Sequence, residues 1–131
     1  MEQATFGPVV EAVMAALAGS GSSAIAGYLD EETLLHMPGA SGLAGEYQGR
    51  QAICGLMDRL TTSTRGTLRF ETVCSGARGD DHVWLRGQIS GYRLEHSLET
   101  TASLEVTVAD DSLREVWLAC TNLVAWDDFW S

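Results

Sequence analysis

The fold is decided by residues 97–109, which read SLETTASLEVTVA. Small or apolar side chains recur at every second position from Leu98 to Val108, while Glu99, Glu105 and Thr107 belong to the alternate, polar set. Successive side chains of a β-strand point to opposite faces of its sheet, so this alternation predicts a long strand with one buried face. We expect the face that carries Leu98 and Val108 to point inward.

Three further strands are predicted, two before this one in the sequence and one after it. They lie at residues 67–75, 82–92 and 113–122, and turn-forming residues separate the strands at 76–81, 91–96 and 110–112. In the last strand, Val116, Leu118, Cys120 and Asn122 share one face. We assign this face to the interior because it carries the apolar side chains.

The N-terminal half shows helical periodicity instead. Pro8 suits a first helical turn, and apolar residues recur at helical spacing until Gly19 and Gly21 end the helix. We expect a brief second helix at 24–29, a short strand at 33–37, a glycine-rich loop at 39–49 and a third helix from residue 50 to 60. Helices followed by antiparallel strands predict one α+β domain over residues 1–131.

The composition excludes several classes of function. The chain has 131 residues and a formal net charge of −10, with 8 basic and 18 acidic side chains. Because no basic cluster is present, we expect no nucleic-acid partner. The apolar runs are shorter than the roughly 20 residues of a membrane span, and Met1–Thr5 lacks the basic start of a signal peptide. We therefore expect a cytoplasmic protein that contacts no membrane.

Neither the cysteines nor the histidines form a metal-binding pattern. Cys54, Cys74 and Cys120 lie in three separate elements without a C-x-x-C pair, and we interpret them as buried, small apolar side chains in a reducing compartment. The three histidines also occur singly, whereas a zinc site needs ligands brought together on one face. The sequence predicts no metal and no cofactor.

Two stretches of sequence resemble a known family. The first reads LHMPG at 35–39 and LAGEYQGRQAI at 43–53, and the second reads LREVW at 113–117 and DDFWS at 127–131. Both resemble the SnoaL-like branch of the nuclear transport factor 2-like (NTF2-like) superfamily, and with the order of helices and strands the resemblance covers nearly the whole chain. It implies a cone-shaped α+β fold, in which N-terminal helices pack on a curved, mostly antiparallel sheet around a pocket. It also implies a homodimer formed through the sheet.

The resemblance implies two catalytic candidates at the ends of strands. His36 leads, because an imidazole can move a proton near neutral pH; the alternative is a hydrogen bond to the glycine-rich loop that only fixes the strand end. Steroid-isomerase relatives place a carboxylate base where this chain has Met37, and the family pattern commonly has an aspartate where it has Asn122. These departures disfavour proton abstraction. Asn122 then either orients a ligand oxygen or caps the turn into residues 126–130.

Arg86 is the third catalytic candidate. If the face that carries Trp84, Arg86 and Gln88 points inward, the guanidinium of Arg86 stabilises an anion or enolate. The alternative is that this face is solvated or lies in a dimer interface. The residues expected to contact the ligand all lie at the pocket or its mouth, and they are Tyr28, Met37, Tyr47, Trp84 and Cys120.

Two functions are compatible with these patterns. The first is a cofactor-independent cyclase or isomerase of secondary metabolism, which would fold an apolar, carbonyl-bearing, polyketide-like metabolite and polarise its oxygen atoms through His36, Asn122 and Arg86. The second is a non-catalytic module, whose pocket holds a hydrophobic ligand or merely accompanies dimerisation.

Overall fold

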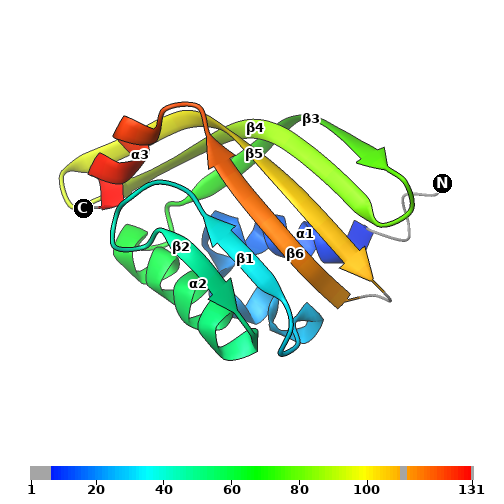
Figure 1. The fold of residues 1–131 in the computed structure, drawn as a ribbon. Helices are drawn as coiled ribbons and strands as arrows, with labels where there is room; N and C mark the ends of the chain where they lie inside the picture. Colours follow the sequence, from blue (N-terminus) through cyan, green and yellow to red (C-terminus); the bar gives the residue numbers. More distant parts are fainter. Residues whose placement is uncertain (1–6, 110–111, 131) are drawn as a thin grey trace.

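A curved, open sheet packs on a layer of helices (Figure 1). The structure is a computed structural model, and it describes residues 7–109 and 112–130. Six strands form the sheet in the order β2-β1-β6-β5-β4-β3. Neighbouring strands are antiparallel except β1 and β6, which run parallel. The strands are β1 Leu34–Met37, β2 Gly45–Gln48, β3 Arg69–Arg78, β4 His82–Arg93, β5 His96–Ala109 and β6 Ser112–Cys120.

The helices cover one face of the sheet. The first, α1 (Gly7–Ala15), continues into a distorted turn, η2 (Ala16–Ser20), and two short 3-10 turns follow, η3 (Gly21–Ala24) and η4 (Ala26–Tyr28). The longest helix, α2, spans Arg50–Thr64, and α3 spans Leu123–Trp130. α2 forms as predicted because apolar residues at helical spacing give it one buried stripe, made of Ile53, Leu56, Met57 and Leu60.

The alternation that predicts β5 is confirmed. Every even-numbered residue from Leu98 to Val108 is buried, while Glu99 and Thr101 are exposed. β4 follows the same rule, with Val83 and Leu85 buried. The predicted α+β fold, a curved and mostly antiparallel sheet under N-terminal helices, is therefore correct. We call the helix-covered side of the sheet the inner face and the opposite side the outer face.

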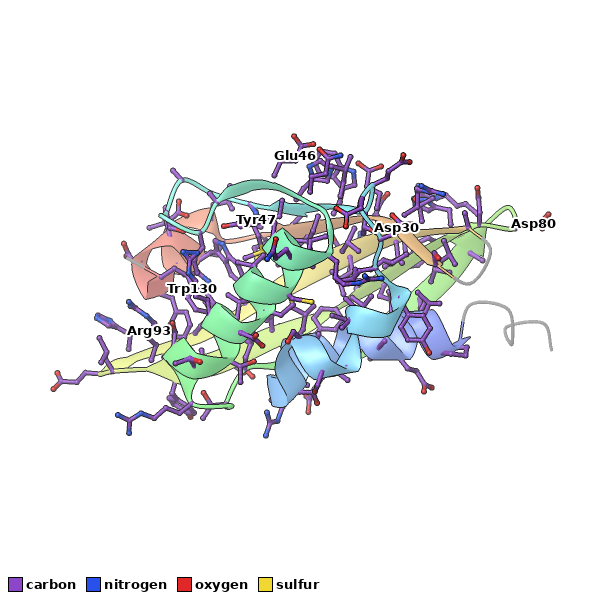
Figure 2. The ribbon with its side chains drawn as sticks, turned by 90° about the horizontal axis from the view of Figure 1, so that it is seen from below. Asp30, Glu46, Tyr47, Asp80, Arg93 and Trp130 are labelled. Carbon is purple, nitrogen blue, oxygen red and sulfur yellow. The ribbon has the colours of Figure 1, made fainter. Side chains whose placement is uncertain are left out.

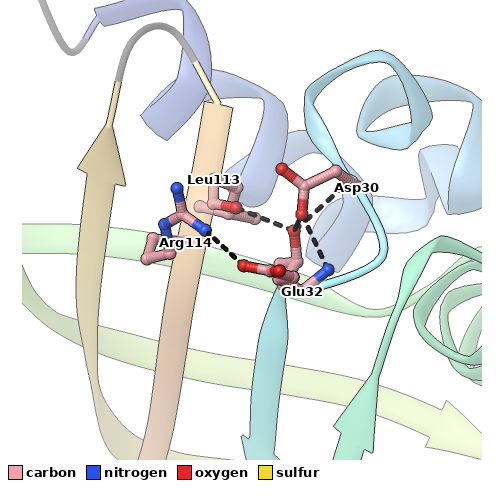
Figure 3. Close-up of polar contacts among 5 residues, drawn as sticks. Asp30, Glu32, Leu113 and Arg114 are labelled. Carbon is pink, nitrogen blue, oxygen red and sulfur yellow. Dashed lines mark hydrogen bonds and ion pairs between the residues drawn. The ribbon is translucent and has the colours of Figure 1, made fainter.

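A polar network holds the start of β1 against β6 (Figure 3). Thr33 is buried; its hydroxyl donates to the backbone oxygen of Leu113 at 2.8 Å and accepts the backbone N–H of Asp30 at 3.1 Å. The carboxylate of Asp30 accepts the backbone N–H of Glu32 at 2.8 Å, and Glu32 pairs with Arg114 at 3.5 Å. The network supports the register of β1 against β6, on which the orientation of every β1 side chain depends.

Several predicted boundaries are wrong. Part of the predicted 39–49 loop forms the strand β2, because its backbone pairs with β1 from Gly45 to Gln48. The predicted helix at 24–29 is a pair of 3-10 turns instead. β3 runs on to residue 78, since Gly76 leaves room for the ring of Trp84 across the strand pair. Of the turn predicted at 110–112, residues 110–111 lie outside the described residues.

Within residues 7–109 and 112–130, no helix combines the length and the apolar character that a bilayer crossing requires.

Candidate functional site

An apolar hollow lies between the inner face of the sheet and the helical layer. Its cavity volume is about 10 Å³, which is close to the minimum for one water molecule. Nine apolar side chains line it: Val13, Leu17, Ile25, Leu35, Met37, Met57, Leu104, Val116 and Leu118. In the described part of the chain, this hollow is narrow and largely filled by the side chains around it.

Strand and helix periodicity place these side chains together. Leu35 and Met37 lie two residues apart in β1, as do Val116 and Leu118 in β6, so each pair shares the inner face. The helical layer contributes side chains at helical spacing from the opposite side. Of the residues predicted to contact a ligand, Met37 alone is among the nine. The other eight lining side chains belong to the apolar periods that predict a core, and no sequence pattern distinguishes a core side chain from one that borders a hollow.

His36 points to the outer face, because its two neighbours in β1 point inward. Its ring stacks on Trp117 with 3.6 Å between centroids and 9° between planes. The Nε2 of His36 lies 2.7 Å from Glu115 Oε2, and the indole N–H of Trp117 donates to the same oxygen at 3.1 Å. Glu46 lies farther away, at 3.9 Å from Nδ1. The catalytic candidate His36 therefore faces away from the hollow, and its catalytic role stays a prediction. For the alternative, a hydrogen bond to the glycine-rich loop at 39–49, the described residues offer only the Glu46 carboxylate, which lies near the ring but beyond hydrogen-bond distance.

The face of Trp84 and Arg86 is also the outer one. Their neighbours in β4, Val83 and Leu85, are buried, whereas Arg86 is exposed and Trp84 lies over Gly76 of β3. The expectation that Arg86 and Trp84 contact a ligand in the pocket is wrong for this reason. The solvated alternative agrees with the exposure of Arg86, and a dimer interface on this face stays a prediction.

Asn122 caps the last helix. It is exposed just beyond β6, and its side-chain oxygen accepts the backbone N–H of Ala125 at 3.0 Å, while its backbone oxygen accepts that of Trp126 at 3.1 Å. This is the arrangement of a helix N-cap. The assignment of Asn122 to the inward face is therefore wrong, because the chain leaves the strand before this residue.

The two tyrosines lie at the margin of the core. Both Tyr28 and Tyr47 are half-buried against it, and the hydroxyl of Tyr47 donates to the backbone oxygen of Leu43 at 2.9 Å. In Figure 2, Glu46 projects away from the molecule, whereas Tyr47 lies on the side of α2. Neither tyrosine lines the hollow.

The cysteines differ from one another. Cys74 is exposed, which contradicts the expectation that all three are buried, while Cys54 and Cys120 are half-buried. Burial, and to a smaller extent the negative charge of Asp127, raises the pKa of Cys120 to about 12. Its thiol is thus a poor nucleophile at neutral pH. Among the residues that the structure describes, no three His, Cys, Asp or Glu side chains converge as metal ligands.

Comparisons with known proteins give structural matches only. No protein-family model and no curated protein match the sequence. Bal32a, from a soil-derived mobile gene cassette, has a TM-score of 0.83 and 23% identity over 97% of this chain and 99% of that one. An NTF2-like protein of Anabaena variabilis has a TM-score of 0.79 and 12% identity over 92% and 89% of the two chains. A candidate SnoaL-like polyketide cyclase of Shewanella denitrificans has a TM-score of 0.75 and 10% identity over 92% and 93%.

The TM-scores show a shared fold, while identities this low leave the chemistry open, since one fold hosts many functions. The matches cover almost the full length of each chain, so the likeness includes the helical layer as well as the sheet. The chain has the NTF2-like fold, the one that SnoaL-like polyketide cyclases also adopt.

Proposed function

We propose that this protein binds a small, neutral, largely apolar molecule in the hollow under its sheet. The observation that carries the proposal is the lining, in which all nine side chains are apolar. A charged or strongly hydrogen-bonding group placed there would lose its water without gaining a partner, at a cost of about 1–3 kcal/mol for a neutral polar group and more for an ion. The lining therefore favours neutral ligands.

The ligand has to displace side chains, because the free space is about 10 Å³. Met37 and Met57 are the adaptable parts of the wall, since an unbranched thioether chain can change rotamer at little cost. The hollow is bordered on its other sides by branched aliphatic side chains with fewer rotamers. We expect the pocket to widen mainly at these two methionines.

The cyclase or isomerase hypothesis remains a prediction. An apolar hollow can still hold a flexible substrate in a reactive conformation. However, His36, Arg86 and Asn122 all lie outside the hollow, so the polarisation of substrate oxygens cannot be assigned to them. If the protein turns over a linear polyketide-type precursor, His36→Ala and Asn122→Ala should leave the turnover rate of the folded protein unchanged. A lower rate in either variant would show that the replaced residue takes part in the reaction.

Ligand binding is tested with a matched pair of probes. Octanol and octanoate have the same chain length and differ in charge, and thermal shift with native mass spectrometry measures their binding. We expect octanol to raise the melting temperature more than octanoate does. Val116→Phe, which fills the hollow, should abolish that difference, whereas Val73→Phe on the surface, at a side chain 79% exposed, should preserve it. Equal binding of the two probes, or an unaffected Val116→Phe variant, would contradict the proposal.

We also propose that two copies of the chain meet through the outer face of the sheet. Trp117 is 51% exposed there, and tryptophan is favoured at the centre of interfaces. Glu105 and Glu115 lie beside it on β5 and β6, and Arg86 lies exposed on β4. A two-fold pair uses the same patch twice, so it can match these opposite charges. Light scattering should show less dimer for Trp117→Glu than for the exposed α3 control Val124→Glu; a monomeric wild-type chain would contradict this.

A further inference from the structure

Residues 38–44, which we call the strap, connect the wall of the hollow to the outside. The strap begins directly after Met37, whose side chain lines the hollow, and ends where β2 begins. In Figure 1 it is the loop between β1 and β2, and it curves towards α3. A movement of the strap therefore acts on one of the two adaptable side chains of the wall.

Two hydrogen bonds tie the strap to α3. The backbone N–H of Ala40 donates to Asp127 Oδ1 at 2.9 Å, and the indole N–H of Trp126 donates to the backbone oxygen of Pro38 at 3.2 Å. Gly39 has a φ of 91°, and a Cβ at this position would collide with the Asp127 carboxylate. The strap thus lies close against the helix, but the contact runs through two side chains of α3.

α3 itself is firmly anchored. Asn122 caps its first turn, and the guanidinium of Arg93, from the end of β4, donates to the backbone oxygen of Phe129 at 3.0 Å. Trp126, Phe129 and Trp130 are buried and meet edge to face. The helix is therefore a fixed support, and the strap is the part that can leave it.

The other walls of the hollow are held differently. β6 is joined to β1 and to β5 by backbone ladders, the second with one register shift at Thr107/Val108, and α2 buries a full apolar stripe. In the described part of the chain, the strap has no ladder to a neighbouring strand; its remaining links are the packing of Leu43 on the core and the bond from the Tyr47 hydroxyl. Lifting the strap costs far fewer interactions than parting the strands.

We propose that the strap opens to admit the ligand to the hollow, and that Trp126 and Asp127 hold it closed. Opening breaks the two bonds to α3 and lets the Met37 side chain move aside. The part of this inference that concerns ligand access rests on the proposed binding function. The part that concerns the opening of the strap does not rest on that function.

Hydrogen exchange tests whether the two hydrogen bonds to Trp126 and Asp127 hold the strap on α3, with a control variant in the same helix. Trp126→Phe removes the N–H that holds Pro38, whereas Trp130→Phe removes an N–H that has no hydrogen-bond partner within the described residues. Loss of one hydrogen bond should raise exchange of the amides of residues 40–44 about three- to tenfold in Trp126→Phe, with no such rise in Trp130→Phe. Asp127→Ala should act like Trp126→Phe, and Asp127→Asn, which keeps an acceptor oxygen, should restore slow exchange.

Unchanged exchange of the strap amides in Trp126→Phe and Asp127→Ala would contradict the proposal that these two side chains hold the strap closed. An equal rise in β5 and α2 would also overturn it, because the variants would then loosen the whole fold. Access is tested by stopped-flow uptake of the neutral fluorescent probe N-phenyl-naphthylamine, which should be faster in Trp126→Phe than in Trp130→Phe. If exchange changes as expected but wild-type protein takes up no probe, the role of Trp126 and Asp127 in holding the strap is supported and the proposed binding function is contradicted. Equal uptake rates in the two variants would overturn the access role alone.

Discussion

Replacing Val116 by threonine tests directly whether the hollow is dry and apolar. The two side chains have nearly the same shape, and the change exchanges one methyl group for a hydroxyl. Val116 is 1% exposed and borders the hollow, whose other eight lining side chains offer no acceptor stronger than the thioether sulfurs of Met37 and Met57. Burying an unsatisfied hydroxyl costs about 1–3 kcal/mol. For a chain of this size, a loss of 1 kcal/mol lowers the melting temperature by roughly 4 °C.

The free energy of unfolding is obtained from urea titrations followed by tryptophan fluorescence, with the slope compared between variants. Val73→Thr is the matched control, because it makes the same exchange in a strand at a side chain 79% exposed. We expect it to change the free energy of unfolding by less than about 0.5 kcal/mol. If Val116→Thr costs as little as the control does, the new hydroxyl is solvated or paired, and the reasoning that makes the hollow selective for neutral ligands is refuted.

Three further predictions follow from single residues. Asn122→Ala removes the N-cap of α3 and should cost about 1 kcal/mol in urea unfolding, while Asn122→Asp should not; equal losses would argue against a cap. Leu94 has a φ of 56° and is 84% exposed, so Leu94→Asn should stabilise by about 0.5–1 kcal/mol in the same assay; a loss would show that the side chain packs. At pH 8, iodoacetamide should label exposed Cys74 before Cys120, whose pKa of about 12 leaves little thiolate, and mass spectrometry of the peptides would detect the reverse order.

The elements with a strong period were predictable from residues alone. β5 alternates without interruption from Leu98 to Val108, and α2 repeats its apolar residues at helical spacing, so local geometry and burial require the same structure. β2 was missed because its four residues, which begin with Gly45 and are followed by Gly49, are too few to show such a period. Its strand geometry comes from pairing with β1, which is a contact between distant backbone groups.

The candidate site divides in the same way. The family resemblance implied a pocket and a ligand contact at Met37; the structure has an apolar hollow that Met37 lines, and the contact with a ligand stays a prediction. The orientations of His36, Arg86 and Trp84 were beyond reach, because a short strand or a mixed face has two possible assignments and a shift of one residue exchanges them. The cluster of His36, Trp117 and Glu115 was missed, although the inward assignment of the Val116 face, which turns the next residue outward, was a signal for it.

The sequence by itself determined the order of the elements with a strong period, the buried face of β5 and the apolar character of the interior, because these depend on periods and composition within short segments. The tertiary structure alone decided which side chains meet. The parallel register of β1 on β6 turns His36 outward towards Trp117 and Glu115. The end of β6 before Asn122 makes that residue a cap for α3. The first outcome depends on a contact between segments about 80 residues apart in the chain, and the second depends on where the pairing of β6 with β5 stops; no local pattern records either.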